Sequence, residues 1–176
     1  MHLVIFLIFL AGIFFLFRWR VGQFKGEEPF EAYLEQLMAH GSVIEDVMLD
    51  NQTLAPYLFV STRGIFNIYY NSEILGRVYG DEEDVSWYQV LEHRKLSMPN
   101  PVRRMEKQRR EFEKIGEYLE MEIPVYEVIC LSKRAVAKLN IGVPIVPLKE
   151  FVAYVIDKPS VLSAEAVEKI KESLAE

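Results

Sequence analysis

The residues with the greatest capacity for chemistry lie in a stretch that predicts a hairpin, with strands at residues 57–61 and 65–70. Side chains of a strand alternate between the faces of a sheet, so Asn67, Tyr69 and Asn71 share one side. Metal-assisted hydrolysis on such a hairpin would need carboxylates to hold the cation and a lysine beside them. That side offers two amides and a phenol, so the pattern argues against this chemistry.

Other residue types that could carry chemistry form no convincing set. Residues 81–84 are four consecutive carboxylates, which fit either a cation-binding loop or, more simply, a solvated one. The three histidines lie far apart in the sequence, and each lacks a visible catalytic partner. The sequence contains no glycine-rich phosphate loop, no Cys/His zinc spacing and no serine elbow.

The composition bounds the class of protein. A chain of 176 residues is long enough for one domain with a substantial core. Its formal charge of −6 excludes a general nucleic-acid polycation. The only cysteine, Cys130, lies in an apolar run, which predicts a small core residue and fits a reducing compartment.

The N-terminus predicts a membrane anchor. An unbroken apolar run extends from Leu3 to Phe17, and residues 1–21 would form a helix of about 31 Å. That length crosses a bilayer if Arg18 and Arg20 extend to the headgroups, with Trp19 as an interfacial anchor. No small-residue cleavage motif follows, so we expect a retained single-pass anchor at residues 1–21 and one domain at residues 22–176.

The charge flanking the anchor predicts its orientation. The nearby basic residues Arg18, Arg20 and Lys25 all follow the apolar run. The positive-inside rule therefore predicts a protein of the cell membrane whose soluble domain faces the cytoplasm.

The remaining chain alternates between helix and strand patterns. Residues 27–39 predict a helix, and residues 43–49, 57–61, 65–70 and 74–79 predict strands of an antiparallel meander. Trp87 and Tyr88 are expected to cover the sheet edge. Asn100 and Pro101 predict the start of a long helix, because asparagine caps helices and proline suits the first helical position.

The last third of the chain completes the predicted fold class. Residues 125–131 and 143–146 predict strands that pair in parallel, and residues 147–156 predict a short helix. Ser163 is expected to cap the final helix. The order of elements predicts an α/β domain with one mixed β-sheet flanked by helices.

These features, taken in order, resemble the nuclease-related domain (NERD) family, a branch of the PD-(D/E)xK restriction-endonuclease-like fold. Five features carry the resemblance from about residue 22 to the C-terminus: Gly26 with Glu27, the stretch 64–68, the glycines at 76 and 80, Trp87 followed by Asn100 and Pro101, and the stretch 143–148. The resemblance implies a restriction-endonuclease-like fold for residues 22–176.

The resemblance also implies where catalytic residues would lie. The family's metal-binding Asp and Glu and its Lys correspond to Pro56, Tyr69 and Asn71, while its glutamine after Asn-Pro corresponds to Arg104. Only Glu27 is retained from the family's acidic set. A single carboxylate does not hold Mg²⁺ in a catalytic geometry, so the resemblance implies the fold without the family's reaction, no metal site and no cofactor.

The first functional hypothesis is a catalytically inactive binding or scaffolding module at the membrane. Its predicted contact surface for an anionic partner is the basic part of residues 103–110, namely Arg103, Arg104, Lys107, Arg109 and Arg110. The surface could bind anionic lipid or a protein partner, with nucleic acid less favoured because of the negative net charge. It also fits an ordinary solvated helix face with i, i+4 ion pairs.

Two alternatives stay open. The chain could be an active Mg²⁺-dependent nuclease, a phosphodiesterase acting on DNA or RNA, with relocated ligands. The available carboxylates would be Glu27, Glu31, Asp46, Asp50 and Glu73, and Arg63, Arg77 or an arginine of the long helix would replace the lysine. The chain could also be an unrelated membrane-anchored assembly partner.

Overall fold

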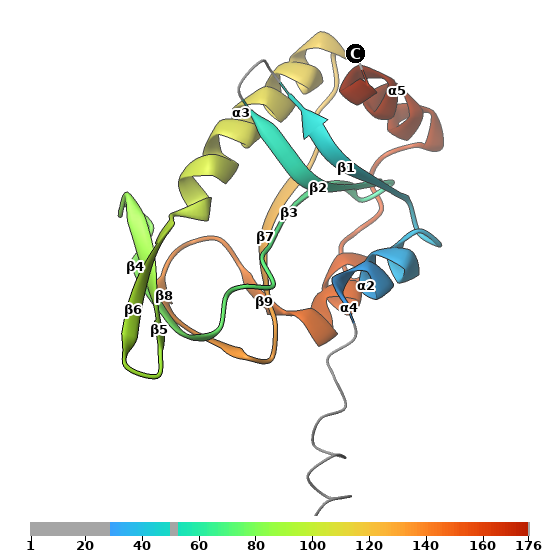
Figure 1. Ribbon diagram of the computed structural model, residues 1–176. Helices are drawn as coiled ribbons and strands as arrows, with labels where there is room; N and C mark the ends of the chain where they lie inside the picture. The colour runs from blue at the N-terminus through green and yellow to red at the C-terminus, as the bar shows by residue number, and fades with distance from the viewer. Residues whose placement is uncertain (1–28, 50–52, 176) are drawn as a thin grey trace, which may run out of the picture.

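The computed structural model describes residues 29–49 and 53–175, and Figure 1 shows its elements. In chain order these are α2 (Phe30–Leu37), β1 (Ser42–Met48), β2 (Leu54–Ser61), β3 (Gly64–Tyr70), β4 (Gly76–Asp81), β5 (Ser86–Leu91), β6 (Arg94–Pro99), α3 (Pro101–Tyr118), β7 (Val125–Leu131), β8 (Ala135–Asn140), β9 (Ile145–Pro147), the 3-10 helix η1 (Leu148–Glu150), α4 (Phe151–Ile156) and α5 (Ala164–Ala175). This sequence of elements confirms the predicted α/β class.

The first sheet has the strand order β1-β2-β3-β7-β9. Strands β1, β2 and β3 form an antiparallel meander, and β7 lies parallel to both β3 and β9. The parallel pairing of β7 with β9 was predicted. Gly64 opens β3 with φ of +128°, and a side chain there would collide with Pro124 at the start of β7, so only glycine suits this junction.

The prediction of a single mixed sheet is wrong, because β4, β5, β6 and β8 form a second sheet. Its strand order is β6-β5-β4-β8, with β4 antiparallel to β5 and parallel to β8. Strand β7 occupies the second edge of β3, so β4 finds no free edge beside β3 and pairs elsewhere. Trp87 and Tyr88 do not cover an edge; they lie within β5, and Trp87 is 2% exposed.

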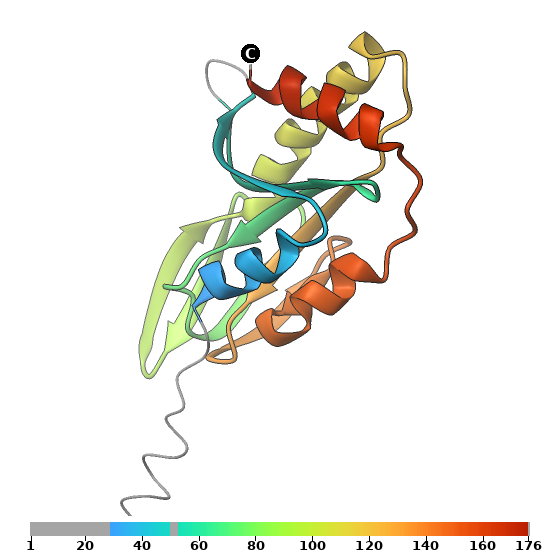
Figure 2. The same cartoon turned by 90° about the vertical axis from the view of Figure 1, so that its right-hand side faces the viewer.

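Helices cover both faces of the first sheet, as Figures 1 and 2 show: α2 and α4 lie on one face, and α3 and α5 on the other. The predicted alternation along β3 holds, since Phe66 and Ile68 pack in the core with α2 and α4. Asn67 points to the other face, where its side chain bonds to α3. The sheet therefore presents its polar row of β3 to α3.

Side-chain caps fix the two long helices as predicted. The Oδ1 atom of Asn100 accepts from the Val102 N–H at 2.9 Å, and Pro101 occupies the first position of α3. The Nδ2 atom of Asn100 also donates to the carbonyls of Asp81, Glu82 and Asp84, which ties the acidic loop to the helix. Ser163 accepts from the Ala166 N–H at the start of α5.

Among residues 29–49 and 53–175, no helix combines the length and apolar character needed to cross a membrane. The predicted anchor at residues 1–21, with Arg18, Trp19 and Arg20, lies outside the described residues. Glu27 and Asp50, two of the candidate carboxylates, also lie outside the described residues.

Candidate functional site

A cavity of about 730 Å³ lies where β3 ends and α3 begins. It gathers Pro56, Tyr69, Asn71 and Arg104, the four described positions that the resemblance assigned to catalysis. The other residues that line it are Pro29, Phe30, Glu31, Tyr57, Tyr70, Ser72, Glu73, Pro99, Asn100 and Pro101. Tertiary structure thus brings the predicted site together from α2, β2, β3 and α3.

The hairpin register sets the geometry of this cavity. Tyr57 lies opposite Ile68, and Leu58 lies opposite Asn67. Continuing that register by one residue sets Pro56 across from Tyr69. The two positions that would carry metal-binding carboxylates in an active enzyme both line the cavity, but they hold a proline and a phenol.

Two side chains of α3 converge on one carbonyl beside the cavity. The guanidinium of Arg104 donates to the Leu54 carbonyl through Nε at 3.2 Å and Nη2 at 2.7 Å. Gln108 donates to the same oxygen through Nε2 at 2.7 Å. The Oε1 atom of Gln108 accepts a hydrogen bond from the Asn67 Nδ2 at 2.9 Å, which satisfies a buried amide of β3. A permanent positive charge thus occupies the wall of the cavity.

Tyr69 is an uncharged part of the cavity lining. Burial raises the pKa of Tyr69, and its hydrogen bond with Asn71 and the charge of Arg104 oppose that shift only in part. The phenol therefore stays protonated at neutral pH and can donate or accept a hydrogen bond. Asn71 also accepts from the Glu73 N–H at 2.8 Å, which fixes the chain as it leaves β3.

Among the described residues, the carboxylates that line the cavity are exposed to solvent. Glu31 of α2 and Glu73 both line it, and both are exposed. Asp46 lies on β1 and is not one of the lining residues. Within the described part of the chain, no group of three His, Cys, Asp or Glu side chains could hold a metal ion.

Sequence reasoning missed Glu127, a carboxylate in the middle of the sheet. It lies on β7 directly beside Asn67 of β3, and its side chain is 10% exposed. Its Oε1 has no hydrogen-bond partner, although the Nε of Arg109 lies 3.8 Å away. Burial raises the pKa of Glu127, and Arg109 offsets part of that effect.

Gln108 and Glu127 were both missed by sequence reasoning, yet each left a signal in the sequence. Gln108 interrupts the apolar stripe of α3, where Met105 and Phe112 are its buried neighbours on the same face. Glu127 falls on the α3 side of β7, between Val125 and Ile129. A polar residue at an inward position of an element is the pattern that would have identified each.

The predicted basic surface of α3 is largely engaged by the protein itself. Arg103 donates to the Glu83 carbonyl, Arg104 to Leu54, and Arg109 lies near Glu127. Lys107 and Arg110 are exposed and lie beside Glu82, Glu83 and Glu106 in a shallow surface hollow. Acidic neighbours therefore dilute the charge that the sequence predicted for this face.

Comparison with known families agrees with this geometry. A sequence model of the nuclease-related domain (NERD) matches residues 22–132, the stretch that runs through α2, the β1–β3 meander, α3 and β7. The chain belongs to the NERD family. Comparisons with curated proteins and with solved structures gave no match.

Proposed function

We propose that this chain is a catalytically inactive NERD protein that serves as a binding or scaffolding module on the cytoplasmic side of the cell membrane. The observation that carries the proposal is the content of the cavity at the end of β3. Pro56, Tyr69 and Asn71 supply no carboxylate and no lysine there, and Arg104 introduces a cation. A divalent metal ion would be repelled by this guanidinium and would find few anionic ligands.

The proposed tether rests on the sequence of residues 1–21, with Arg18, Trp19 and Arg20 at the membrane surface. Residues 22–28 would then connect the bilayer to α2. The exposed Lys107 and Arg110 are the basic side chains of α3 that remain best suited to an anionic lipid or protein partner.

A nuclease assay tests the loss of catalysis. The full chain, purified in a nonionic detergent, is incubated with plasmid DNA and with single-stranded DNA and RNA in the presence of Mg²⁺ or Mn²⁺. We expect no cleavage above that seen with a chelator, because the described lining of the cavity offers a metal ion few anionic ligands. Cleavage that requires the metal would contradict the proposal.

One observation favours a second candidate, an active nuclease with relocated ligands. Glu31 of α2 and Glu73 in the turn after β3 line the same cavity. If the full chain cleaves nucleic acid, this candidate expects Glu31→Gln or Glu73→Gln to abolish cleavage. Glu35→Gln is the matched control, because Glu35 lies on α2 but is exposed outside the lining residues.

A further inference from the structure

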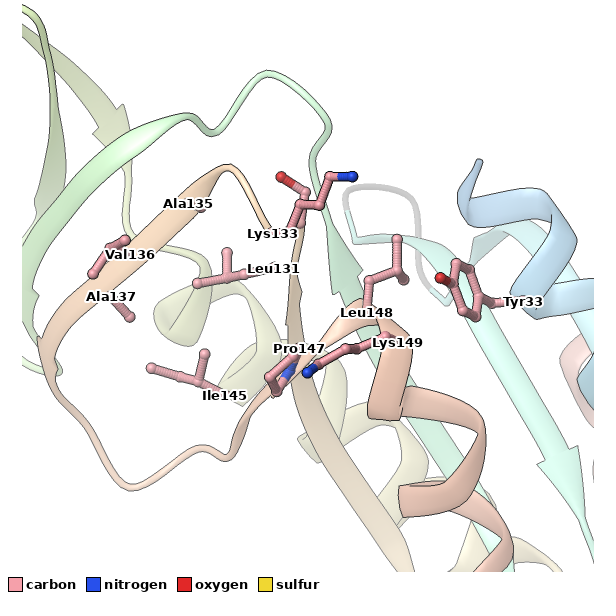
Figure 3. Close-up of a pocket in the computed structure, with 11 residues that line it drawn as sticks. Tyr33, Leu131, Lys133, Ala135, Val136, Ala137, Ile145, Pro147, Leu148 and Lys149 are labelled. Carbon is pink, nitrogen blue, oxygen red and sulfur yellow. The ribbon is translucent and has the colours of Figure 1, made fainter. Parts of the chain in front are cut away.

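A second cavity of about 680 Å³ lies on the other side of β7, between β8, β9 and α2. Figure 3 shows Leu131 and Ile145 pointing into the space that the β8 and β9 segments enclose, with Ala137 beside them. Lys133 lies beside Leu131, Lys149 lies beside Pro147, and Tyr33 of α2 lies beyond Leu148. The volume is within the range typical of small-molecule sites, about 300–1,000 Å³.

The lining is divided between an apolar part and a cationic part. Among the described residues that line this cavity, two are lysines and none is a carboxylate. The Lys149 side chain is 74% exposed, and its Nζ lies 3.4 Å from the Glu150 Oε1. This is a surface ion pair, which solvent weakens. The surroundings therefore suit a ligand with a hydrocarbon part and an anionic head.

Candidate occupants differ in charge. Residues 18–28 of this chain contain Arg18, Arg20 and Lys25 against Glu27 and Glu28, so this stretch carries a net charge of +1 and complements the two lysines less well than an anionic headgroup does. An anionic lipid instead complements the lysines with its headgroup and the apolar floor with an acyl chain. The proposed tether would supply such lipids, because the seven residues 22–28 span at most about 25 Å between the bilayer and Pro29.

We propose that this cavity binds one acyl chain of an anionic membrane lipid, with Lys133 and Lys149 contacting the headgroup. The choice of a membrane lipid rests on the proposed tether, whereas the cavity and its charges are independent of it. Tyr33 lies one helical turn beyond Pro29, so the cavity sits next to the point where the tether joins the domain.

Photolabelling of the full chain in nanodiscs tests the proposal. The discs contain neutral phosphatidylcholine doped with either phosphatidylglycerol or phosphatidylcholine, each carrying the same diazirine-bearing acyl chain. Peptide mass spectrometry locates the labelled residues. We expect phosphatidylglycerol to label Leu131, Ala137 or Ile145 about tenfold more than phosphatidylcholine, given two lysines near the headgroup.

Two variants separate the roles of charge and space. Lys133→Glu with Lys149→Glu should reduce the phosphatidylglycerol labelling to the phosphatidylcholine level, whereas the matched α5 pair Lys169→Glu with Lys171→Glu should not. Ala137→Leu fills the cavity without changing charge and should also abolish the labelling. Circular dichroism checks the fold of each variant; if Ala137→Leu unfolds, the lysine pair decides alone.

The outcomes distinguish this proposal from the tether. Equal labelling by both lipids, unchanged labelling in the lysine variant, or no labelling of residues 131–149 overturns the lipid site. Labelling within residues 1–21 reports the tether separately in the same sample. Label on those residues but not on the cavity leaves the tether supported and rejects the lipid site; label on neither rejects both.

Discussion

At the scale of single residues, Arg104 changes what the cavity at the end of β3 can bind. An active enzyme of this architecture would use carboxylates to attract a cation and let the cation meet the phosphate. Here a guanidinium is held by the Leu54 carbonyl, and the facing positions are Pro56 and Tyr69. The cavity therefore presents a cation at its wall and uncharged side chains where carboxylates would hold a metal ion.

Glu127 gives the same polar face a measurable dependence on pH. Because burial raises its pKa above the ordinary value of 4.5, folding disfavours the ionised carboxylate. The energetic cost of ionising Glu127 in the folded protein is absent below pH 4.5. It grows as the pH rises through the raised pKa of the folded protein, and it is constant above that pKa. The free energy of unfolding therefore falls as this carboxylate ionises.

We expect Glu127→Gln to stabilise residues 22–176 by about 1 kcal/mol at pH 7, because it removes a buried charge with an unpaired oxygen. Urea unfolding followed by circular dichroism between pH 4 and pH 8 measures the difference. The gain should vanish near pH 4, where the wild-type carboxyl is protonated. Glu117→Gln, an exposed change on α3, should have no effect; a loss of stability in Glu127→Gln at pH 7 would contradict the argument.

At the scale of elements, α3 joins the two sheets and furnishes the cavity wall. Its start is fixed by Asn100, which binds three carbonyls of the loop after β4. Its middle faces the first sheet, where Gln108 bonds to both Asn67 and Leu54. Of the basic side chains that the sequence suggested for a partner, Arg103 and Arg104 donate to carbonyls of the protein itself, and Arg109 lies near Glu127. Lys107 and Arg110 are exposed beside acidic side chains.

Charge reversal of those two residues tests the remaining surface of α3. Lys107→Glu with Arg110→Glu should weaken binding of residues 22–176 to vesicles containing phosphatidylglycerol about thirtyfold, since each of the two cations near an anionic surface contributes about 1 kcal/mol. Co-sedimentation measures the binding, and Lys169→Glu with Lys171→Glu on α5 is the control. If the α3 variant binds vesicles as tightly as the wild type, this helix face is an ordinary solvated surface.

The elements differ in how well the sequence predicted them. The helix from Pro101, the β2–β3 hairpin and the final helix carry strong local signals, namely caps, glycine and apolar periodicity. Strands β5 and β6 were missed because both are short and mixed in polarity, and β6 is largely exposed, so neither shows a clear pattern. Their pairing with β4 is a non-local choice that depends on β7 occupying the edge of β3.

At the scale of the whole molecule, the described domain places its two cavities around α2. Glu31 of this helix lines the cavity at the end of β3, and Tyr33 lines the apolar cavity beside β9. A tether that ends just before α2 would hold both cavities close to the bilayer. This arrangement suits a module that acts at a membrane surface.

Removal of residues 1–21 tests the tether. We expect the full chain to remain with membranes after alkaline carbonate washing and to need detergent for release, because about 20 apolar residues suffice to span a bilayer. The variant of residues 22–176 should fractionate with soluble proteins and keep its circular dichroism spectrum. Release of the full chain by carbonate would contradict the tether, and unfolding of the variant would mean that residues 1–21 pack against the domain.

The sequence by itself determined the α/β class, the hairpin with its alternating faces and the family, because these depend on local periodicity and on residues at fixed spacing. It also supplied the uncharged residues Pro56, Tyr69 and Asn71. Only the tertiary structure decided that the strands divide into two sheets, that Arg104 and Gln108 share the Leu54 carbonyl and that Glu127 is buried beside Asn67. Those features arise from contacts between residues distant in the chain, which local patterns do not encode.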